Sequence, residues 1–366
     1  MSALVASLDR LALPADRLRR SLYALVARVP GAAPWLVRRD RRVALIASAH
    51  AGIAFLITAT FPMLLFVLGP VLLGVAHVAS DVRYLVLRRR VPAWWKLATL
   101  SVCVALIGLR AAGEMFHGIM LLYAEHAIAL VWMSFAGLAA LRLGGSGRRA
   151  AIMGLVLMGL GAASILAPLG SRVAFVHLHN CVAVGLWLWL FRMRLRYAAI
   201  PLLCFAVALW MLNSNWVLTL LERTGGSSAF GLHLLAAADF TAPGVSSRFA
   251  LTLTLSFVFL QSVHYAAWLL LIPQEDMTRQ APITFRRSAR SLVEDFGAWG
   301  VSLILLAAAA VIAGAFSDVL ASRRLYLSLA MFHNYLELAA ATFFFVLGAP
   351  SKAQAGGAEA VVTVPG

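Results

Sequence analysis

The chain has 366 residues, of which 62% are hydrophobic and only 13% are charged, and its formal net charge is +16. Soluble domains are about 45–50% apolar and about 25% charged, so this composition excludes a soluble globular protein and indicates one embedded in lipid. The basic residues lie between apolar runs, which is typical of membrane topology. We therefore exclude nucleic acid as a partner and expect the lipid bilayer instead.

Residues 1–42 form the first predicted segment. They carry nine arginines interleaved with apolar residues, and no 7–15-residue apolar run precedes a small-residue cleavage site. We therefore expect a basic, amphipathic, cytoplasmic segment lying on anionic lipid, not a signal peptide. The three cysteines, Cys103, Cys181 and Cys204, lie in separate apolar runs, which argues against a disulfide framework or a structural zinc site.

Residues 43–348 are predicted to be an all-α, polytopic transmembrane helix bundle. A membrane-spanning helix needs roughly 20 mostly apolar residues, and ten such runs occur here. They cover 43–61, 64–87, 97–113, 115–141, 150–168, 173–191, 198–220, 249–272, 299–317 and 325–347. The first two meet at Phe61-Pro62, so we expect them to form a helical hairpin.

The distribution of lysine and arginine predicts the orientation of these spans. If the N-terminus is cytoplasmic, 24 basic residues fall in cytoplasmic segments and six fall outside. Cytoplasmic loops of membrane proteins carry such an excess. We therefore expect an even number of spans, both termini in the cytoplasm, and a multi-pass protein of the inner (plasma) membrane. No pattern in the sequence indicates an oligomeric state.

Two long connections and a tail complete the predicted organisation. Residues 221–248, on the outside, contain a weakly amphipathic piece around Phe230–Phe240 and are expected to lie over the mouth of the bundle. Residues 273–298, on the inside, are predicted to be a basic loop. Residues 349–366 are rich in alanine, glycine and valine and predict a flexible C-terminal tail.

Ionisable side chains occur inside the predicted spans, where each costs about 2.5–3.5 kcal/mol on insertion scales. Such residues persist when they face the protein interior and have partners, so they are candidates for a functional site. Three acids in these runs are Asp81, Glu125 and Glu337. Eight of the nine histidines fall in apolar runs, namely His50, His77, His117, His126, His177, His179, His264 and His333.

Spacing links some of these residues. His77 and Asp81 lie four residues apart, as do His333 and Glu337, so each pair shares a helix face. Each pair can direct an imidazole and a carboxylate toward one centre. The carboxylate then serves either as a ligand or as the group that orients a ligating imidazole.

Three other predicted spans contribute histidine near mid-membrane. They carry His126, then His177 and His179, then His264. His177 and His179 are about 200° apart on a helix, so we expect only one of them to face inward. His50 and His117 lie near span ends and are expected to be structural, and His233 is expected to be a loop or lid residue.

The set predicts a shared metal site, because oxygen-activating iron binds imidazoles and often a carboxylate. The predicted ligands of ferrous iron are His77, His126, His177, His264 and His333. Asp81 and Glu337 are the predicted catalytic carboxylates.

The segment Gly74–Asp81, GVAHVASD, resembles the early G-x-P-H-G-x-x-D motif of the Brp/Blh family of membrane β-carotene 15,15′-dioxygenases. The HxxxD core is kept, while Ala76 and Val78 replace the proline and the glycine of the motif. The segment Phe332–Glu337 is similar to the closing P-H-x-x-x-x-D segment of the family, with the acid at a slightly different spacing.

The segment Phe259–Tyr265 occupies the place of the family motif F-x-H-S-x-x-H, whose second histidine is absent because position 268 is tryptophan. The resemblance implies iron held by histidines, with His77, His264 and His333 as the better ligands and His126 or His177 as a fourth.

The leading hypothesis is a membrane-embedded, metal-dependent oxidoreductase, most naturally a non-haem iron oxygenase. Its substrate is expected to be lipophilic, of the carotenoid or isoprenoid class, because an apolar bundle that opens to lipid admits such a molecule without water. Three alternatives stay open. They are a proton-coupled transporter, a haem-binding membrane protein with histidines as axial ligands, and a structural subunit of a larger membrane complex.

Overall fold

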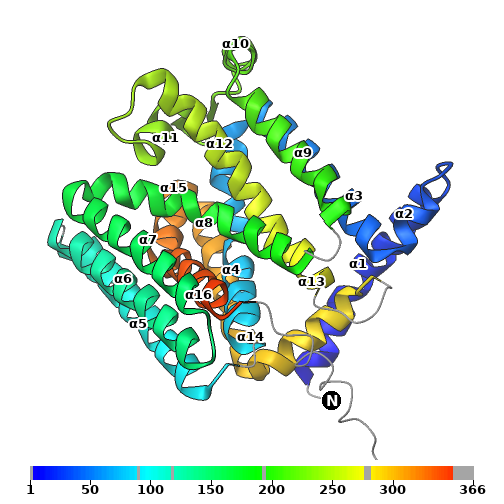
Figure 1. Cartoon of the computed structure of the whole chain (residues 1–366). Helices are drawn as coiled ribbons and strands as arrows, with labels where there is room; N and C mark the ends of the chain where they lie inside the picture. The colour runs from blue at the N-terminus through cyan, green and yellow to red at the C-terminus, as the bar shows by residue number, and fades with distance from the viewer. Residues whose placement is uncertain (1–2, 89–90, 117–118, 192–194, 276–281, 349–366) are drawn as a thin grey trace, which may run out of the picture. The chain divides into compact units, whose positions relative to one another are not determined.

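The computed structural model describes residues 3–88, 91–116, 119–191, 195–275 and 282–348, so the predicted tail and His117 lie outside the described residues. Across these ranges the chain is almost entirely helical (Figure 1), which confirms the all-α prediction. The chain divides into two compact units. The first contains residues 1–90 and 176–330, and the second contains residues 91–175 and 331–366.

The first unit is organised around α4 (Pro62–Asp81), which continues into a π-helical turn, η1 (Val82–Leu87). Pro62 stands at the first helical position, where its missing N–H costs no hydrogen bond. The other helices of this unit are α1 (Ala3–Ala27), α2 (Ala33–Val37), α3 (Arg39–Thr60), α9 (Leu195–Leu212), α10 (Asn215–Thr224), α11 (Leu234–Thr241), α12 (Ser247–Ala266), η3 (Ala267–Leu271), α13 (Ile272–Glu275), α14 (Phe285–Ser317) and α15 (Val319–Ala330).

Helix α4 packs against α3, α12, α14 and α15, and it can approach two of them closely because it carries glycine. A Cβ added at Gly74 would lie 2.3 Å from Cζ of Tyr326 on α15, and one at Gly69 would lie 3.3 Å from the ring of Tyr265 on α12. Small residues that admit neighbouring side chains are a usual means of packing membrane helices. The two tyrosine rings therefore lie directly on the α4 backbone.

The second unit packs α16 (Phe332–Leu347) against α5 (Ala93–Phe116), α6 (Ile119–Arg142) and α7 (Gly147–Leu166). Helix α8 (Pro168–Phe191) begins in this unit and continues into the first. Ser146 caps α7, and its backbone N–H donates to the carbonyl of Val346 at 2.9 Å, which ties the start of α7 to the end of α16.

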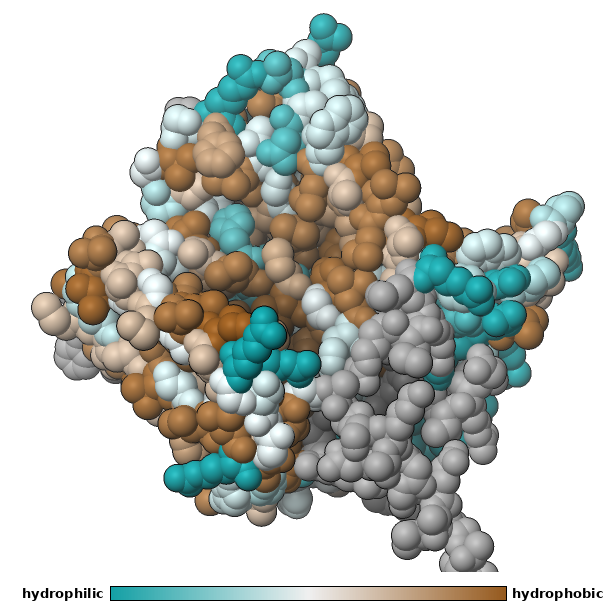
Figure 2. All heavy atoms as spheres, in the orientation of Figure 1, coloured by the Kyte–Doolittle hydropathy of each residue, from teal (hydrophilic) through white to brown (hydrophobic). Residues whose placement is uncertain are grey.

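Many helices present apolar side chains to the outside, and hydrophobic residues cover much of the face seen in Figure 2. Among the described residues, eight helices are long and apolar enough to cross a membrane, or nine with the bent pair α9–α10, whose axes differ by 68°. These correspond to nine of the ten predicted spans. The sixth, 173–191, falls in α8, which is not among the eight.

The connection 221–248 is more ordered than a loop. It contains a short hairpin of β1 (Ser228–Ala229) and β2 (Leu232–His233), turned by Phe230 and Gly231 with φ of 55° and 75°. His233 then caps α11, because its Nδ1 accepts from the N–H of Leu235 at 3.2 Å. Helix α11 packs against α12.

The prediction of a loop over 273–298 is wrong in its second half, because α14 begins at Phe285. Gly297, with φ of 70°, breaks this helix into a basic segment, 285–296, and an apolar segment, 298–317. The apolar segment is exposed on almost every side, with Trp299 at 87% and Phe316 at 90%. Glycine adopts a positive φ without a steric penalty, so the helix can break at Gly297. The break coincides with the change from basic to apolar sequence.

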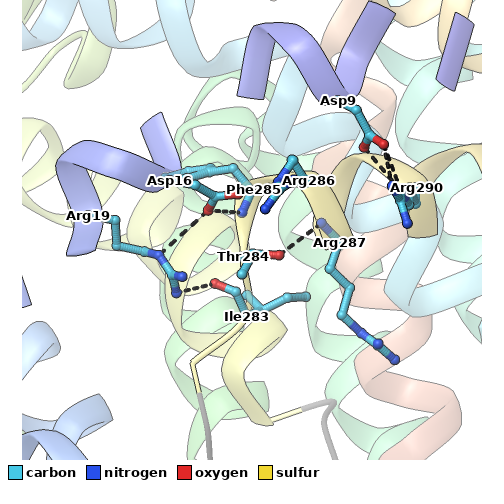
Figure 3. Close-up of polar contacts among 9 residues, drawn as sticks. All are labelled: Asp9, Asp16, Arg19, Ile283, Thr284, Phe285, Arg286, Arg287 and Arg290. Atoms are coloured by element: carbon cyan, nitrogen blue, oxygen red, sulfur yellow. Dashed lines mark hydrogen bonds and ion pairs between the residues drawn. The ribbon is translucent and has the colours of Figure 1, made fainter. Parts of the chain in front are cut away.

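The basic segment of α14 is helical because its first turn is capped from two sides (Figure 3). Thr284 accepts from the N–H of Arg287 at 3.1 Å. Asp16 of α1 accepts from the N–H groups of Phe285 and Arg286 at 2.8 and 3.3 Å. The first N–H groups of a helix have no partner within it. Here α1 supplies the acceptor, the Asp16 carboxylate, for two of them.

Two further contacts hold α1 against α14. Arg19 donates to the carbonyl of Ile283 at 2.6 Å, and Arg290 Nε donates to both carboxylate oxygens of Asp9 at 3.1 and 3.0 Å. Burial by itself raises the pKa of Asp16. The N–H groups of Phe285 and Arg286 and the charge of Arg19 outweigh it and hold that pKa below the ordinary aspartate value.

A carboxylate whose pKa is lowered by folding stabilises the folded state above its unfolded pKa, and this stabilisation is lost as the pH falls through the folded value. We therefore expect α1 to stay docked on α14 at neutral pH and to detach progressively below about pH 4. Asp16→Asn should weaken docking at pH 7 by about 1 kcal/mol, because it removes one of the two oxygens that accept from α14 and the charge that pairs with Arg19 and Arg286.

Amide hydrogen exchange across Ala3–Ala27 measures this detachment. Asp239→Asn is the matched control, because it removes the same charge from an exposed position on α11. Equal protection of α1 in both variants would show that Asp16 does not hold the two helices together.

Candidate metal centre

Three histidines of the first unit come together from three helices. They are His77 on α4, His179 on α8 and His264 on α12, and all three are buried, at 1%, 5% and 0% exposure. The ring centroid of His264 lies 5.3 Å from that of His77 and 4.9 Å from that of His179. His264 is therefore the central member of a three-imidazole cluster.

The separation of His77 and His264 fits ligation of one ion, and the His179 ring lies at a similar centroid distance from His264. A metal–nitrogen bond is about 2.0–2.1 Å, and half an imidazole ring adds about 1 Å, so two imidazoles on a tetrahedral ion have centroids roughly 5 Å apart. The nearest ring nitrogens of His77 and His264 lie within 4.8 Å of one another. Imidazole donors suit iron, zinc, copper or nickel better than magnesium or calcium. The donor set thus fits the predicted class of metal.

Asp81 adds a buried carboxylate to the same unit. It lies one turn after His77 on α4 and is completely buried. Tyr265 also lies beside His77, with ring centroids 4.5 Å apart, and packs on Gly69. His77 therefore has a buried carboxylate one turn along its own helix and a buried phenol against its ring.

Both α4 and α12 continue into π-helix within five residues of their histidines. The π-helical turn η1 follows Asp81, and η3 begins three residues after His264. Ser80 Oγ donates to the carbonyl of Trp268 in η3 at 2.8 Å, which links the two helices at this level. π-helical turns are rare and occur frequently at functional sites. The sequence does not predict these π-helical turns, because one extra residue in a turn leaves no clear mark in the hydrophobic periodicity.

Helix α8 brings His179, and not His177, to the cluster. The Nε2 of His177 lies 3.1 Å from the carbonyl of Thr241, and its ring packs edge-on against Phe257. The two residues point to different neighbours, as their separation of about 200° requires. His177 is the predicted ligand of this span, but the structure brings His179 to the cluster instead. The sequence alone could not decide between them, because both residues occur in the same apolar run.

His50 is positioned as a structural residue. Its Nε2 lies 3.0 Å from the carbonyl of Ser262 and 3.2 Å from the hydroxyl of the same residue. It therefore connects α3 to α12 and stays apart from the three-histidine cluster.

Arg323 falls between the predicted spans 299–317 and 325–347, where a side chain exposed to water is expected. Arg323 lies on α15 and is buried at 5% exposure. Its Nε donates to the carbonyl of Phe66 at 2.8 Å, and its guanidinium carbon lies 3.8 Å from the centroid of the Phe66 ring. A cation over an aromatic face is stabilised by the charge distribution of the ring. No pattern in the sequence distinguished this arginine from the exposed Arg324.

The other predicted site residues, His126, His333 and Glu337, belong to the second unit and are buried there. The His126 ring lies 5.4 Å from that of Phe175. His333 and Glu337 offer a ring nitrogen and a carboxylate oxygen within 4.8 Å of one another, so this four-residue spacing does bring the two groups together. Their assignment to the metal stays a prediction.

Glu125, next to His126, has a different environment. One of its oxygens accepts from Arg110 Nη2 at 2.5 Å and from the hydroxyl of Tyr335 at 2.7 Å. Arg110 falls near the end of the predicted span 97–113; it lies on α5, and its side chain is 14% exposed. The ion pair joins α5 to α6, and the Tyr335 hydrogen bond joins α16 to them.

No protein-family model, no curated protein and no solved structure matches this chain.

Removing the cation of this pair should destabilise the second unit. Arg110→Met leaves the buried Glu125 charge without its counter-ion, which costs about 3 kcal/mol or more for a buried pair. The double variant Arg110→Met with Glu125→Leu should recover most of the loss, because no buried charge remains. Thermal unfolding of the purified protein in detergent measures both, and equal stability of the single and double variants would contradict a structural ion pair.

Proposed function

We propose that this protein is an integral membrane, metal-dependent oxidoreductase, and specifically a non-haem iron oxygenase that acts on a lipophilic substrate of the isoprenoid or carotenoid class. The observation that carries the proposal is the cluster of His77, His179 and His264 within one unit. The resemblance of Gly74–Asp81 and Phe259–Tyr265 to motifs of the Brp/Blh family supports the same activity.

In this proposal, the three imidazoles hold the ion, and Asp81 either completes the ligand set or orients the imidazole of His77 as a hydrogen-bond acceptor. Bound iron would supply the activation of oxygen. The protein contributes burial, since all four side chains are nearly or completely excluded from solvent. An apolar substrate entering from lipid would meet this site without bringing water, so water would not compete for the open ligand position.

Metal content tests the proposal directly. Purified wild-type protein should contain close to one iron per chain, measured by inductively coupled plasma mass spectrometry. His77→Ala, His179→Ala and His264→Ala should each lose most of it, because each removes one imidazole ligand from a small set. Loss of an outer partner of a ligand already costs about 10–100-fold in affinity, so Asp81→Asn should show a reduction of that size.

His177→Ala is the matched control, since it lies on the same helix two residues from His179 and contacts Thr241 instead. His50→Ala is a second control, held by Ser262. Metal-free wild-type protein, or equal loss in His177→Ala and His179→Ala, would contradict the assignment. Stoichiometric zinc in place of iron would retain the site and reject the oxygenase. His126→Ala and His333→Ala test separately whether the second unit supplies ligands.

A proton-coupled transporter is the second candidate, favoured by one observation. Helices α9 and α10 are bent by 68° across a short break, and discontinuous helices are characteristic of transporters. Flux driven by a pH gradient in proteoliposomes would support it, and its absence with metal bound would favour the oxidoreductase.

A haem protein is less compatible with the cluster. Imidazoles on opposite faces of a haem iron have ring centroids roughly 6 Å apart, more than the 4.9 and 5.3 Å observed. A Soret band in the purified protein would nevertheless overturn the non-haem assignment.

For the membrane topology, we propose ten spans, with both termini in the cytoplasm of the inner membrane. The ten are the eight candidate helices, the bent pair α9–α10, and α8, which at 24 residues exceeds the roughly 20 needed. The excess of basic residues on the cytoplasmic side supports this orientation. Single cysteines at Ala3 and in 349–366 should resist a membrane-impermeant thiol reagent applied to intact cells, and their labelling would contradict the topology.

A further inference from the structure

A cavity of about 1060 Å³ lies between α1, α4, η1, η3 and both segments of α14, all in the first unit. This volume slightly exceeds the usual range of ligand-binding pockets, about 300–1,000 Å³. The cavity has no part in the proposed oxidoreductase site, because none of the three clustered histidines lines it. Its two kinds of wall indicate what it binds.

One wall is strongly basic. Six arginines line the cavity, with Glu294 as the one acidic residue among its lining. They are Arg19, Arg83, Arg88, Arg286, Arg287 and Arg290. Even if the aspartates that pair with them are included (Asp9, Asp16 and Asp295), positive charges exceed negative ones by two.

The ion pairs at this wall do not balance its positive charge. Arg83 and Arg88 both donate to the same oxygen of Asp295, at 2.6 and 2.9 Å, and both donate to Ser291 at 2.6 Å. Two guanidinium groups thus share one carboxylate. Arg287, on α14, is exposed, and its side chain projects away from α1 in Figure 3. A further anion would therefore be attracted to this wall.

A second part of the lining is apolar, and we call it the apolar wall. It is formed by Ala76 and Ala79 of α4 and by Val301, Ile304 and Ala308 of α14. These α14 residues follow the break at Gly297, in the segment whose outer face is almost wholly exposed and apolar. The cavity therefore spans the level at which the molecule changes from a basic surface to a lipid-facing one.

From this arrangement, we propose that the cavity binds an anionic phospholipid of the bilayer, with its phosphate on the arginine wall and its acyl chains along α4 and α14. Basic pockets beside membrane helices on the cytoplasmic side bind anionic lipid headgroups. Arginine suits this role because its planar guanidinium donates two hydrogen bonds to one phosphate. A free phosphate compound would use the basic wall but leave the apolar wall empty.

The test uses the full chain purified in mild detergent. Native mass spectrometry compares the binding of phosphatidylglycerol with that of phosphatidylcholine carrying the same acyl chains. Wild-type protein should prefer the anionic lipid. The double variant Arg286→Gln with Arg287→Gln should bind it about fivefold more weakly for each arginine removed. The control, Arg17→Gln with Arg20→Gln, removes equal charge from exposed positions of α1 outside the cavity and should change binding by less than about twofold.

A second pair of variants tests the apolar wall without changing charge. Ile304→Trp fills the cavity and should reduce lipid binding, whereas Leu303→Trp, on the same helix and 64% exposed, should not. Equal binding of the two lipids, or equal effects of a variant and its control, would overturn the proposal. Displacement of phosphatidylglycerol by inorganic phosphate would show that the site takes free phosphate groups instead of lipid.

Discussion

Polar groups inside an apolar bundle have no water to bind, so other groups of the protein must satisfy them. This constraint explains the contacts that join the helices of each unit. In the first unit, Ser80 of α4 donates to the Trp268 carbonyl of η3, and Arg323 of α15 donates to the Phe66 carbonyl of α4. In the second unit, Glu125 accepts from Arg110 and Tyr335. Each of these hydrogen bonds joins two particular helices, and apolar side chains pack between them.

The histidine cluster places three further buried polar groups side by side. Three imidazoles from α4, α8 and α12 lie together where α4 and α12 change to π-helix. A π-helical turn inserts a residue and so changes the direction of the side chains that follow. Glycine at positions 69 and 74 lets two tyrosine rings lie on α4 beside this level. The cluster is therefore held by rigid helices and not by loops, which is what a precise ligand geometry requires.

The contact between α1 and α14 likewise gives backbone N–H groups a partner within the protein. The first N–H groups of α14 are satisfied by Asp16 from a helix more than 260 residues earlier in the chain. That capping lets the basic segment 285–296 remain helical before the break at Gly297. It also sets the arginines of both helices around one cavity, next to the apolar half of α14. A basic surface and a lipid-facing surface thus meet at one place.

The sequence alone determined the helical class, nine of the apolar segments, and the side-chain pairs at four-residue spacing, because these depend on composition and on helix periodicity within one segment. It could not select His179 over His177, place Arg110 and Arg323 in the interior, or predict the helix that begins at Phe285. Each of these depends on a partner distant in the chain: His264 for His179, Glu125 for Arg110, Phe66 for Arg323 and Asp16 for Phe285. Local periodicity orients a side chain around its own helix, but only tertiary packing decides which neighbour it meets.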